Sequence, residues 1–232
     1  MAIVFDGDDT LWETQVFYSR AKEYFYALML EQGFDREAAR HKLAEIDVAN
    51  VSRLGFSKHR FPLSMREVYE YFCRTTGEFV DPAVLEKASD IGYSVLDNKP
   101  PLVKGARELL SCLEQHSYNC YLYTAGDLDI QCEKIEALNI AGYFKAIYIR
   151  ESKNEEGLRN IIAEQGLESG ETWVVGNSLR SDVKPALELG LRCIWLANGG
   201  WEYDETELDV SDWVWRVTDL TEALPLLLDG QC

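Results

Sequence analysis

Three acidic side chains follow the first apolar stretch of the chain. Residues 2–5 read AIVF, and Asp6, Asp8 and Asp9 come soon after them. A carboxylate such as Asp6 can attack phosphorus and form an aspartyl-phosphate, a known use of an aspartate nucleophile. Asp8 can protonate a leaving alcohol and then activate water, which is general acid–base catalysis. This stretch is therefore a candidate site for phosphoryl transfer.

Further polar groups that suit this chemistry stand beyond later apolar runs: Thr124, Lys153, Asn177 and Asp182. Thr124 can hydrogen-bond phosphoryl oxygens together with nearby backbone N–H groups, and Lys153 can offset phosphoryl charge. Mg²⁺ is usually held by one or two carboxylates, waters and phosphate oxygens. Asp6 and Asp182 can supply these carboxylates, so a Mg²⁺ site is expected.

Five short apolar runs predict the buried β-strands that position these groups. They read AIVFD, CYLYT, AIYIR, TWVVG and RCIWL, at residues 2–6, 120–124, 146–150, 172–176 and 192–196. Segments with helical spacing separate the later runs, beginning at residues 106, 129, 154 and 181. Alternating strands and helices are typical of a doubly wound, Rossmann-like parallel sheet of the α/β class. Ligands of such sheets bind beyond the carboxyl ends of the strands, where the polar groups lie.

The region between the first two predicted strands departs from this alternation. We find no convincing buried strand there, and apolar residues recur at helical spacing, as at Phe17, Ala21, Tyr24 and Leu28. Two prolines in DNKPPLVKG mark the return to the core. We therefore expect an α/β core of residues 1–12 and 100–232 and a smaller, all-helical domain of residues 13–99.

The composition excludes several classes of protein. Of the 232 residues 47% are hydrophobic, which argues against disorder, and no apolar run is long enough to cross a membrane. The formal net charge of −17 repels phosphate backbones and anionic lipids, so neither nucleic acid nor membrane is an expected partner. The six cysteines include no CxxC pair, which argues against a zinc site or disulfide framework. The first apolar run has no basic leader, so a cytoplasmic location is expected.

Four short motifs, taken together, resemble those of the Mg²⁺-dependent phosphatases of the haloacid dehalogenase (HAD) superfamily. DGDDT is similar to a first motif that reads Asp-x-Asp-x-Thr after an apolar strand, and LYTAG, ESKNEE and VVGNSLRSD resemble the second, third and fourth motifs. The matching positions are Asp6, Asp8, Thr10, Thr124, Lys153 and Asp182. The helical insert has the place and character of that family's cap domain, which selects the substrate.

This resemblance implies hydrolysis of a small phosphate monoester through an aspartyl-phosphate on Asp6, with Mg²⁺ as cofactor. The catalytic residues it implies are Asp6, Asp8, Thr124 and Lys153. Those expected at the substrate are Thr10, Ala125 and Gly126, and those expected around the metal are Asp6, Asp8, Asp182 and Asn177. The fourth motif commonly begins Gly-Asp, whereas Asn177 follows Gly176 here. Since Asn still forms hydrogen bonds, we expect altered Mg²⁺ affinity rather than lost binding.

A basic cluster, Lys58, His59 and Arg60, stands out in the acidic helical region. Because a cap covers the site in this family, Lys58 and Arg60 are expected to meet an anionic group of the substrate. A solvated basic turn is the alternative.

Other functions remain open at this point. A phosphomutase differs mainly in whether water or a second hydroxyl accepts the phosphoryl group. A dehalogenase of the same superfamily attacks carbon without Mg²⁺ and, in relatives, has no acidic residue where Asp8 stands. A non-hydrolytic, phosphorylated signalling or binding protein is a third alternative, although signalling receiver domains are about half this length. The expected partner is a small phosphorylated metabolite, whose identity the sequence leaves open, as it does the oligomeric state.

Overall fold

The computed structural model describes residues 1–97, 99–197 and 212–228. The chain divides into two compact units. Met1–Glu13 and the chain from Pro100 onwards form the sheet unit, and Thr14–Lys99 forms the helical unit. The helical unit thus begins at residue 14, next to the boundary expected from the sequence.

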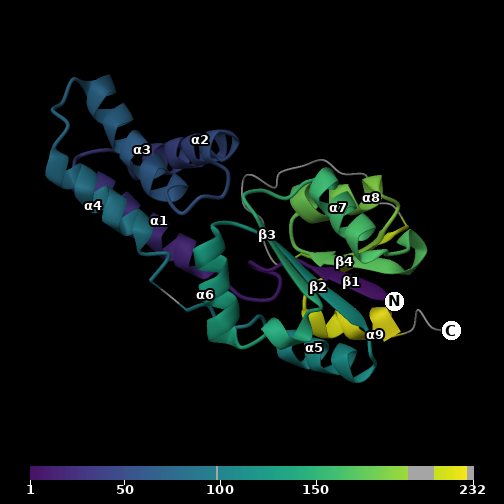
Figure 1. The fold of residues 1–232 in the computed structure, drawn as a ribbon. Helices are drawn as coiled ribbons and strands as arrows, with labels where there is room; N and C mark the ends of the chain where they lie inside the picture. The colour runs from purple at the N-terminus through teal and green to yellow at the C-terminus, as the bar shows by residue number, and fades with distance from the viewer. Residues whose placement is uncertain (98, 198–211, 229–232) are drawn as a thin grey trace. The chain divides into compact units, whose positions relative to one another are not determined.

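The sheet unit is built on a six-stranded parallel sheet (Figure 1). Its strands are β1 (Ala2–Phe5), β2 (Asn119–Ala125), β3 (Ala146–Arg150), β4 (Thr172–Gly176), β5 (Arg192–Leu196) and β6 (Val214–Val217). Its helices are α5 (Ala106–Gln115), α6 (Leu128–Leu138), α7 (Glu155–Gln165), α8 (Lys184–Glu188) and α9 (Ala223–Leu228). Shorter helical turns are η1 (Ala141–Tyr143), η2 (Ser169–Glu171), η3 (Leu179–Val183) and η5 (Leu220–Glu222). The predicted doubly wound α/β class is confirmed.

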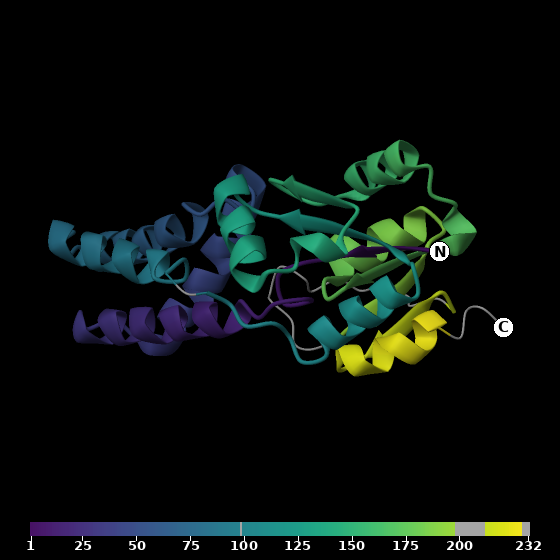
Figure 2. The same cartoon turned by 60° about the horizontal axis from the view of Figure 1, so that its bottom comes forward.

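Alternate residues of β1 pack into two different apolar layers. Ile3 and Phe5 belong to the layer that contains residues of α5 and α9, whereas Ala2 and Val4 belong to the layer with α7 and α8. Figure 1 shows these two pairs of helices on opposite faces of the sheet, and Figure 2 shows the teal α5 beside the yellow α9. Because helices cover both faces, the strands read as nearly continuous apolar runs.

The position of β1 decides where polar groups gather. The strand order is β3-β2-β1-β4-β5-β6, so β1 stands where the order reverses. Phe5 at its end pairs with Leu122 of β2 and with Val175 of β4. A crevice forms beyond the carboxyl ends of the strands at such a reversal. The residues that follow β1, β2 and β4 therefore meet at one edge of the sheet.

Two parts of the sheet unit differ from the sequence-based expectation. β6 and α9 were not predicted, and β6 is a short strand at the edge of the sheet. The helix expected from residue 181 begins instead at Lys184, after the π-helical turn η3. Pro185 suits the first turn of α8, because proline lacks the N–H that a later helical position needs.

The helical unit consists of α1 (Gln15–Glu31), α2 (Arg36–Leu54), α3 (Arg60–Thr76) and α4 (Pro82–Tyr93), with no strand among its described residues. Aspartate side chains cap two of these helices, since Asp35 accepts from the N–H of Ala38 and Asp81 from that of Ala83. The buried face of α1 differs from expectation: Tyr24 is 59% exposed, and the buried residues are Ala21, Phe25, Tyr26, Leu28 and Met29. Within the described ranges, no helix is long and apolar enough to span a membrane.

A buried ion pair connects α2 and α3 inside the helical unit. The Arg60 guanidinium pairs with Asp47, and both side chains are at most 6% exposed. Ser64 donates to Asp47 Oδ1 over 2.9 Å and accepts from Asn50 Nδ2 over 3.0 Å. Burying charged groups costs free energy that only close partners offset, so this network requires all of its members.

We predict that Asp47→Ala destabilises the helical unit by about 3 kcal/mol, because it leaves the buried Arg60 charge uncompensated. The matched control is Glu23→Ala, which removes the partner of Arg36 at the surface and is expected to cost less than about 1 kcal/mol. Hydrogen exchange of the α2 and α3 amides measures both effects. Equal protection in the two variants would contradict the prediction.

Candidate functional site

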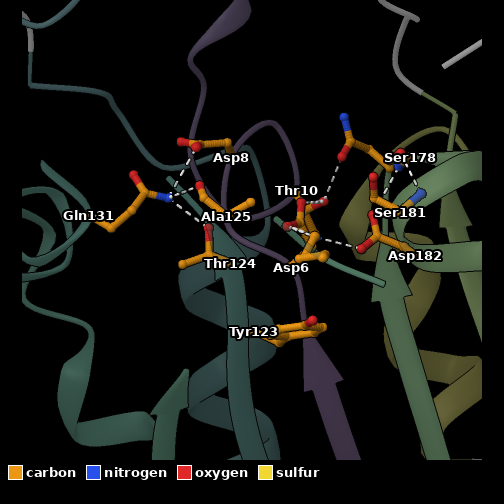
Figure 3. Close-up of polar contacts among 12 residues, drawn as sticks. Asp6, Asp8, Thr10, Tyr123, Thr124, Ala125, Gln131, Ser178, Ser181 and Asp182 are labelled. Atoms are coloured by element: carbon orange, nitrogen blue, oxygen red, sulfur yellow. Dashed lines mark hydrogen bonds and ion pairs between the residues drawn. The ribbon is translucent and has the colours of Figure 1, made fainter. Parts of the chain in front are cut away.

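The site is centred on Asp6, the residue that follows β1. Its backbone N–H donates to the carbonyl of Val175 in β4 over 2.9 Å, which fixes it at the reversal of the sheet. The Thr10 hydroxyl donates to Asp6 Oδ2 over 2.9 Å, and Lys153 forms an ion pair with Asp6 Oδ1. Asp6 is only 7% exposed, so these two partners replace most of its water. Figure 3 shows Asp6 between Thr10 and Asp182.

Lys153 joins two buried carboxylates. Its Nζ lies 2.6 Å from Asp182 Oδ1 and also contacts Asp6. Burial by itself lowers the pKa of Lys153, but the charges of Asp182 and Asp6 outweigh that effect and raise it. The ammonium group is therefore charged at neutral pH and holds the ends of two chain segments together.

The pKa of Asp6 is raised to about 7. Burial is the main cause and the charges of Asp182 and Asp8 add to it, while Lys153 acts in the opposite direction. A carboxylate in this state favours an additional cation. The oxygen donors of Asp6 and Asp182 are of the kind that Mg²⁺ prefers, and Mg²⁺ completes its shell with waters and substrate. The residues present thus fit this ion, although no cluster of three acidic, histidine or cysteine side chains able to hold a metal occurs among the described residues.

The turn after β4 presents Asp182 toward Lys153. Asp182 Oδ2 accepts the N–H of Ser178 over 3.0 Å, and Ser178 Oγ accepts the N–H of Ser181 over 3.0 Å. A Cβ on Gly176 would lie 2.4 Å from the Asp182 carboxyl carbon, so glycine is required for this close approach. The Ser178 N–H and the close packing of Gly176 therefore fix the position of the Asp182 carboxylate.

Asn177 lies beside this group through Thr10. Its Oδ1 is 3.3 Å from Thr10 Oγ1, and its backbone carbonyl accepts from the Trp195 indole over 2.9 Å. Thr10 has a single hydroxyl hydrogen, and its oxygen lies closer to Asp6 Oδ2 than to Asn177 Oδ1. The hydrogen bond to Asp6 is therefore the stronger of the two contacts. Asn177 thus lies next to Thr10, which also contacts Asp6, and it adds no charge to this group.

Asp8 occupies a second polar cluster, which includes residues that the sequence analysis missed. Its Oδ1 accepts from the Trp12 indole and lies 2.7 Å from Lys134 Nζ, while Oδ2 accepts from Gln131 Nε2 over 3.1 Å. Gln131 also donates to Thr124 Oγ1 over 2.7 Å. One signal for this cluster exists in the sequence: the polar residues 131 and 134 of α6 lie three apart, so they share a helix face.

Thr124 is brought into this cluster, but the role expected for Gly126 is not supported. Thr124 is buried and accepts from Gln131, so its own hydroxyl hydrogen remains able to donate. The Gly126 N–H donates to the Arg150 carbonyl over 2.8 Å, which takes away the backbone donor expected for a phosphoryl oxygen. The Ala125 carbonyl accepts from Gln131 over 3.1 Å and thus helps to hold it.

Within the basic cluster of the helical unit, Arg60 does not match the role expected for it, while that of Lys58 stays a prediction. Arg60 is a buried partner of Asp47 and not an exposed cation, because α3 begins at this residue and turns its side chain toward α2. Lys58 is half-buried in the turn before α3, and the exposed His59 has its Nδ1 2.8 Å from the Tyr93 hydroxyl. The solvated basic turn that was the alternative does not describe Arg60 either.

The fold and the buried carboxylates after β1 and β4 define a hydrolase of the α/β class, and comparisons with known proteins agree. Residues 1–190 match the family model of haloacid dehalogenase-like hydrolases. The chain therefore belongs to the haloacid dehalogenase-like hydrolase family.

Individual relatives cover nearly the whole chain. A glyceraldehyde 3-phosphate phosphatase from Pyrococcus furiosus is 24% identical over 97% of this chain and 92% of its own. A haloacid dehalogenase-like hydrolase from Xanthomonas campestris has a similar structure, with a TM-score of 0.80, 26% identity and coverage of 100% and 92% of the two chains. The fold is also similar to that of the HAD hydrolase YfnB from Bacillus subtilis, solved bound to magnesium, with a TM-score of 0.67, 20% identity and 98% coverage of each chain.

We predict that Gly176→Ala moves the Asp182 carboxylate away from Lys153 and destabilises the sheet unit by about 1–3 kcal/mol, because the added methyl overpacks the turn. Gly170→Ala is the control, since a Cβ there meets nothing within 4 Å. Thermal unfolding and crystal structures of the two variants provide the measurement. An unmoved Asp182 in Gly176→Ala would refute the steric argument.

Proposed function

We propose that this protein is a Mg²⁺-dependent phosphatase that hydrolyses a small-molecule phosphate monoester through an aspartyl-phosphate on Asp6. The observation that carries the proposal is the buried group of Asp6, Lys153 and Asp182, with Asp8 two residues beyond the nucleophile. A nucleophile, a fixed cation and an acid–base carboxylate thereby lie at one edge of the sheet. The Pyrococcus phosphatase supports the same class of reaction.

In the first step an oxygen of Asp6 attacks phosphorus, and the bond between phosphorus and the ester oxygen breaks. Asp8 gives its proton to the departing alcohol. Lys153 offsets negative charge on the transferring group, and the Thr124 hydroxyl hydrogen donates to one of its oxygens. In the second step Asp8 takes a proton from water, which attacks the phosphorus of the aspartyl-phosphate and releases inorganic phosphate and Asp6.

Asp6 and Asp182 are the carboxylates proposed to hold Mg²⁺, with Asn177 nearby, whereas the Asp8 carboxylate, also expected at the metal from the sequence, contacts Gln131 and Lys134 instead. When bound, the ion neutralises charge on the phosphoryl group and orients it for attack. The magnesium-bound YfnB structure, which shares the fold, supports the choice of ion. The neutral Asn177 lowers the charge available to the cation, so we expect weaker affinity than a second carboxylate there provides.

Asp8 favours this reaction over the dehalogenase alternative, because attack on carbon with halide as leaving group needs no acid at that position. A phosphomutase remains the nearest alternative. It uses the same first step but passes the phosphoryl group to a second hydroxyl, so release of inorganic phosphate separates the two. A non-hydrolytic signalling protein would keep its acyl-phosphate instead of turning it over.

The substrate and setting are further parts of the proposal. We propose a small phosphorylated metabolite as the partner and the helical unit as the cap that selects it. The acidic net charge of −17 supports neither nucleic acid nor an anionic membrane as a partner. The cytoplasmic location stays a prediction.

We predict that Mg²⁺-dependent release of phosphate from p-nitrophenyl phosphate falls by at least about 10⁴-fold in Asp6→Asn, because an amide cannot serve as the nucleophile. Addition of EDTA to the unchanged protein abolishes turnover as well. Asp9→Asn is the matched control, since Asp9 has φ 58° and asparagine tolerates this left-handed conformation. Turnover that survives in Asp6→Asn would refute the nucleophile.

The intermediate makes a separate prediction. Acid quenching during turnover traps a phosphoryl group on the peptide that contains Asp6, detectable by mass spectrometry and removed by hydroxylamine, because an acyl-phosphate is stable to brief acid but not to that nucleophile. Asp6→Asn provides the control without label. Turnover with no labelled peptide at any quench time would contradict the intermediate and favour direct attack of water on the ester.

A further inference from the structure

We infer that Gln131 and Lys134 of α6 are positioning residues that set the Asp8 carboxylate for proton transfer. This inference rests on the proposed phosphatase function and extends it to residues outside the four sequence motifs. It predicts that changes in these two α6 side chains lower kcat/KM most for substrates with strongly basic leaving groups.

Both oxygens of Asp8 are held from α6. Lys134 Nζ lies 2.7 Å from Oδ1, and Gln131 Nε2 donates to Oδ2 over 3.1 Å. An aspartate side chain has only two rotatable bonds, so one donor on each oxygen fixes both the position and the plane of the carboxylate. The Asp8 side chain is nevertheless 32% exposed, which leaves one side of it open toward a ligand.

The loop alone does not provide this placement. The indole of Trp12 donates to Oδ1, and the backbone N–H of Asp9 donates to the carbonyl of Trp12 over 2.6 Å. Trp12 is fully buried in the core, so its indole also fixes Oδ1. The donor to Oδ2 comes from Gln131 of α6, and Lys134 adds the charged contact to Oδ1.

Gln131 also connects Asp8 to the proposed phosphoryl-binding hydroxyl. Its amide nitrogen lies 2.7 Å from Thr124 Oγ1 as well as 3.1 Å from the Ala125 carbonyl, and its side chain is 1% exposed. Figure 3 shows the Gln131 amide directed toward Asp8, Thr124 and Ala125. A buried amide with these partners holds the ends of β1 and β2 in one register, so proton donor and phosphoryl-binding group keep a fixed separation.

The two lysines of the site pair with different carboxylates. Lys153 contacts Asp6 and Asp182, whereas Lys134 contacts Asp8, and its side chain is 19% exposed. Among the described residues, the ion-pair partner of Lys134 is Asp8. Loss of Lys134 therefore removes a contact of the proposed acid–base residue and leaves the Lys153 group intact.

The experiment compares substrates of one shape that differ in the need for a proton. Phenyl phosphate expels a more basic oxygen than p-nitrophenyl phosphate, so it depends more strongly on a well-placed acid. kcat/KM is measured with Mg²⁺ for both substrates, because it reports the step in which the ester bond breaks. The variants are Lys134→Met, Lys134→Arg and Gln131→Leu, and Lys145→Met is the matched control at an exposed position of the sheet unit.

For Lys134→Met and Gln131→Leu we expect kcat/KM to fall by at least about tenfold with phenyl phosphate, since small misplacements of a catalytic group cost up to about 100-fold. With p-nitrophenyl phosphate the fall in Lys134→Met stays within about threefold, because its leaving group needs little protonation. Gln131→Leu also loses the contact with Thr124, so it loses some activity with both substrates but more with phenyl phosphate. Lys134→Arg restores part of the loss, and Lys145→Met matches the unchanged protein. Equal losses with both substrates would overturn the inference, because they indicate a general structural defect.

Failure of the proposed function is distinguishable from failure of the inference. If the unchanged protein releases no phosphate from either substrate, a narrowly selective cap or a non-hydrolytic role is left for the proposed function, and crystal structures of Lys134→Met and Gln131→Leu then decide the positioning role. A displaced Asp8 carboxylate supports the role. An Asp8 carboxylate in the same place in both variants overturns it.

Discussion

The burial of Asp6 and Asp182 against Lys153 is the constraint on which the site depends. Two carboxylates at this depth are costly unless a cation contacts both, and the ammonium group lies 2.6 Å from Asp182 while also pairing with Asp6. The attraction is strong because water is nearly absent from it. Lys153 compensates the cost of burying Asp6 only in part, because burial still raises the pKa of Asp6 to about 7. An added cation would stabilise the ionised form of Asp6, which is the physical basis for proposing a divalent cation here.

The sheet makes this arrangement possible because three segments far apart in the sequence end at the same edge. β1 lies between β2 and β4, so the residues after these strands meet without any long loop. Close approach then depends on small residues. A Cβ on Gly7 would lie 2.4 Å from the Trp12 ring and 2.8 Å from Thr124 Oγ1, and Gly176 meets the same limit at Asp182. The glycines of the first and fourth motifs thus allow this close packing around the polar residues proposed to be catalytic.

The sequence was sufficient for those parts of the site that backbone topology determines. Asp6, Thr124 and Asp182 follow apolar strands, and parallel strands bring their carboxyl ends together whatever the side chains do. Gln131 and Lys134 were missed because the face that a helix turns toward the site depends on how α6 packs, which periodicity alone does not give. Arg60 was misjudged for a related reason: a charged residue in an acidic region reads as exposed, and only the structure shows Asp47 beside it. Gly126 was expected at the substrate, and the structure shows that its backbone N–H already donates to the Arg150 carbonyl.

The neutral side chain at position 177 fits the same balance of charge. Around the site, the carboxylates of Asp6, Asp8 and Asp182 face the ammonium groups of Lys153 and Lys134. A further carboxylate at position 177 would lie near Thr10 and Asp6 and raise the pKa of Asp6 further, in addition to burial and the charges of Asp182 and Asp8. The neutral amide keeps a hydrogen-bond acceptor for Thr10 without that cost. Under the proposed function, Asp6 therefore needs less cation binding to stay ionised, at the expense of weaker affinity for the proposed cation.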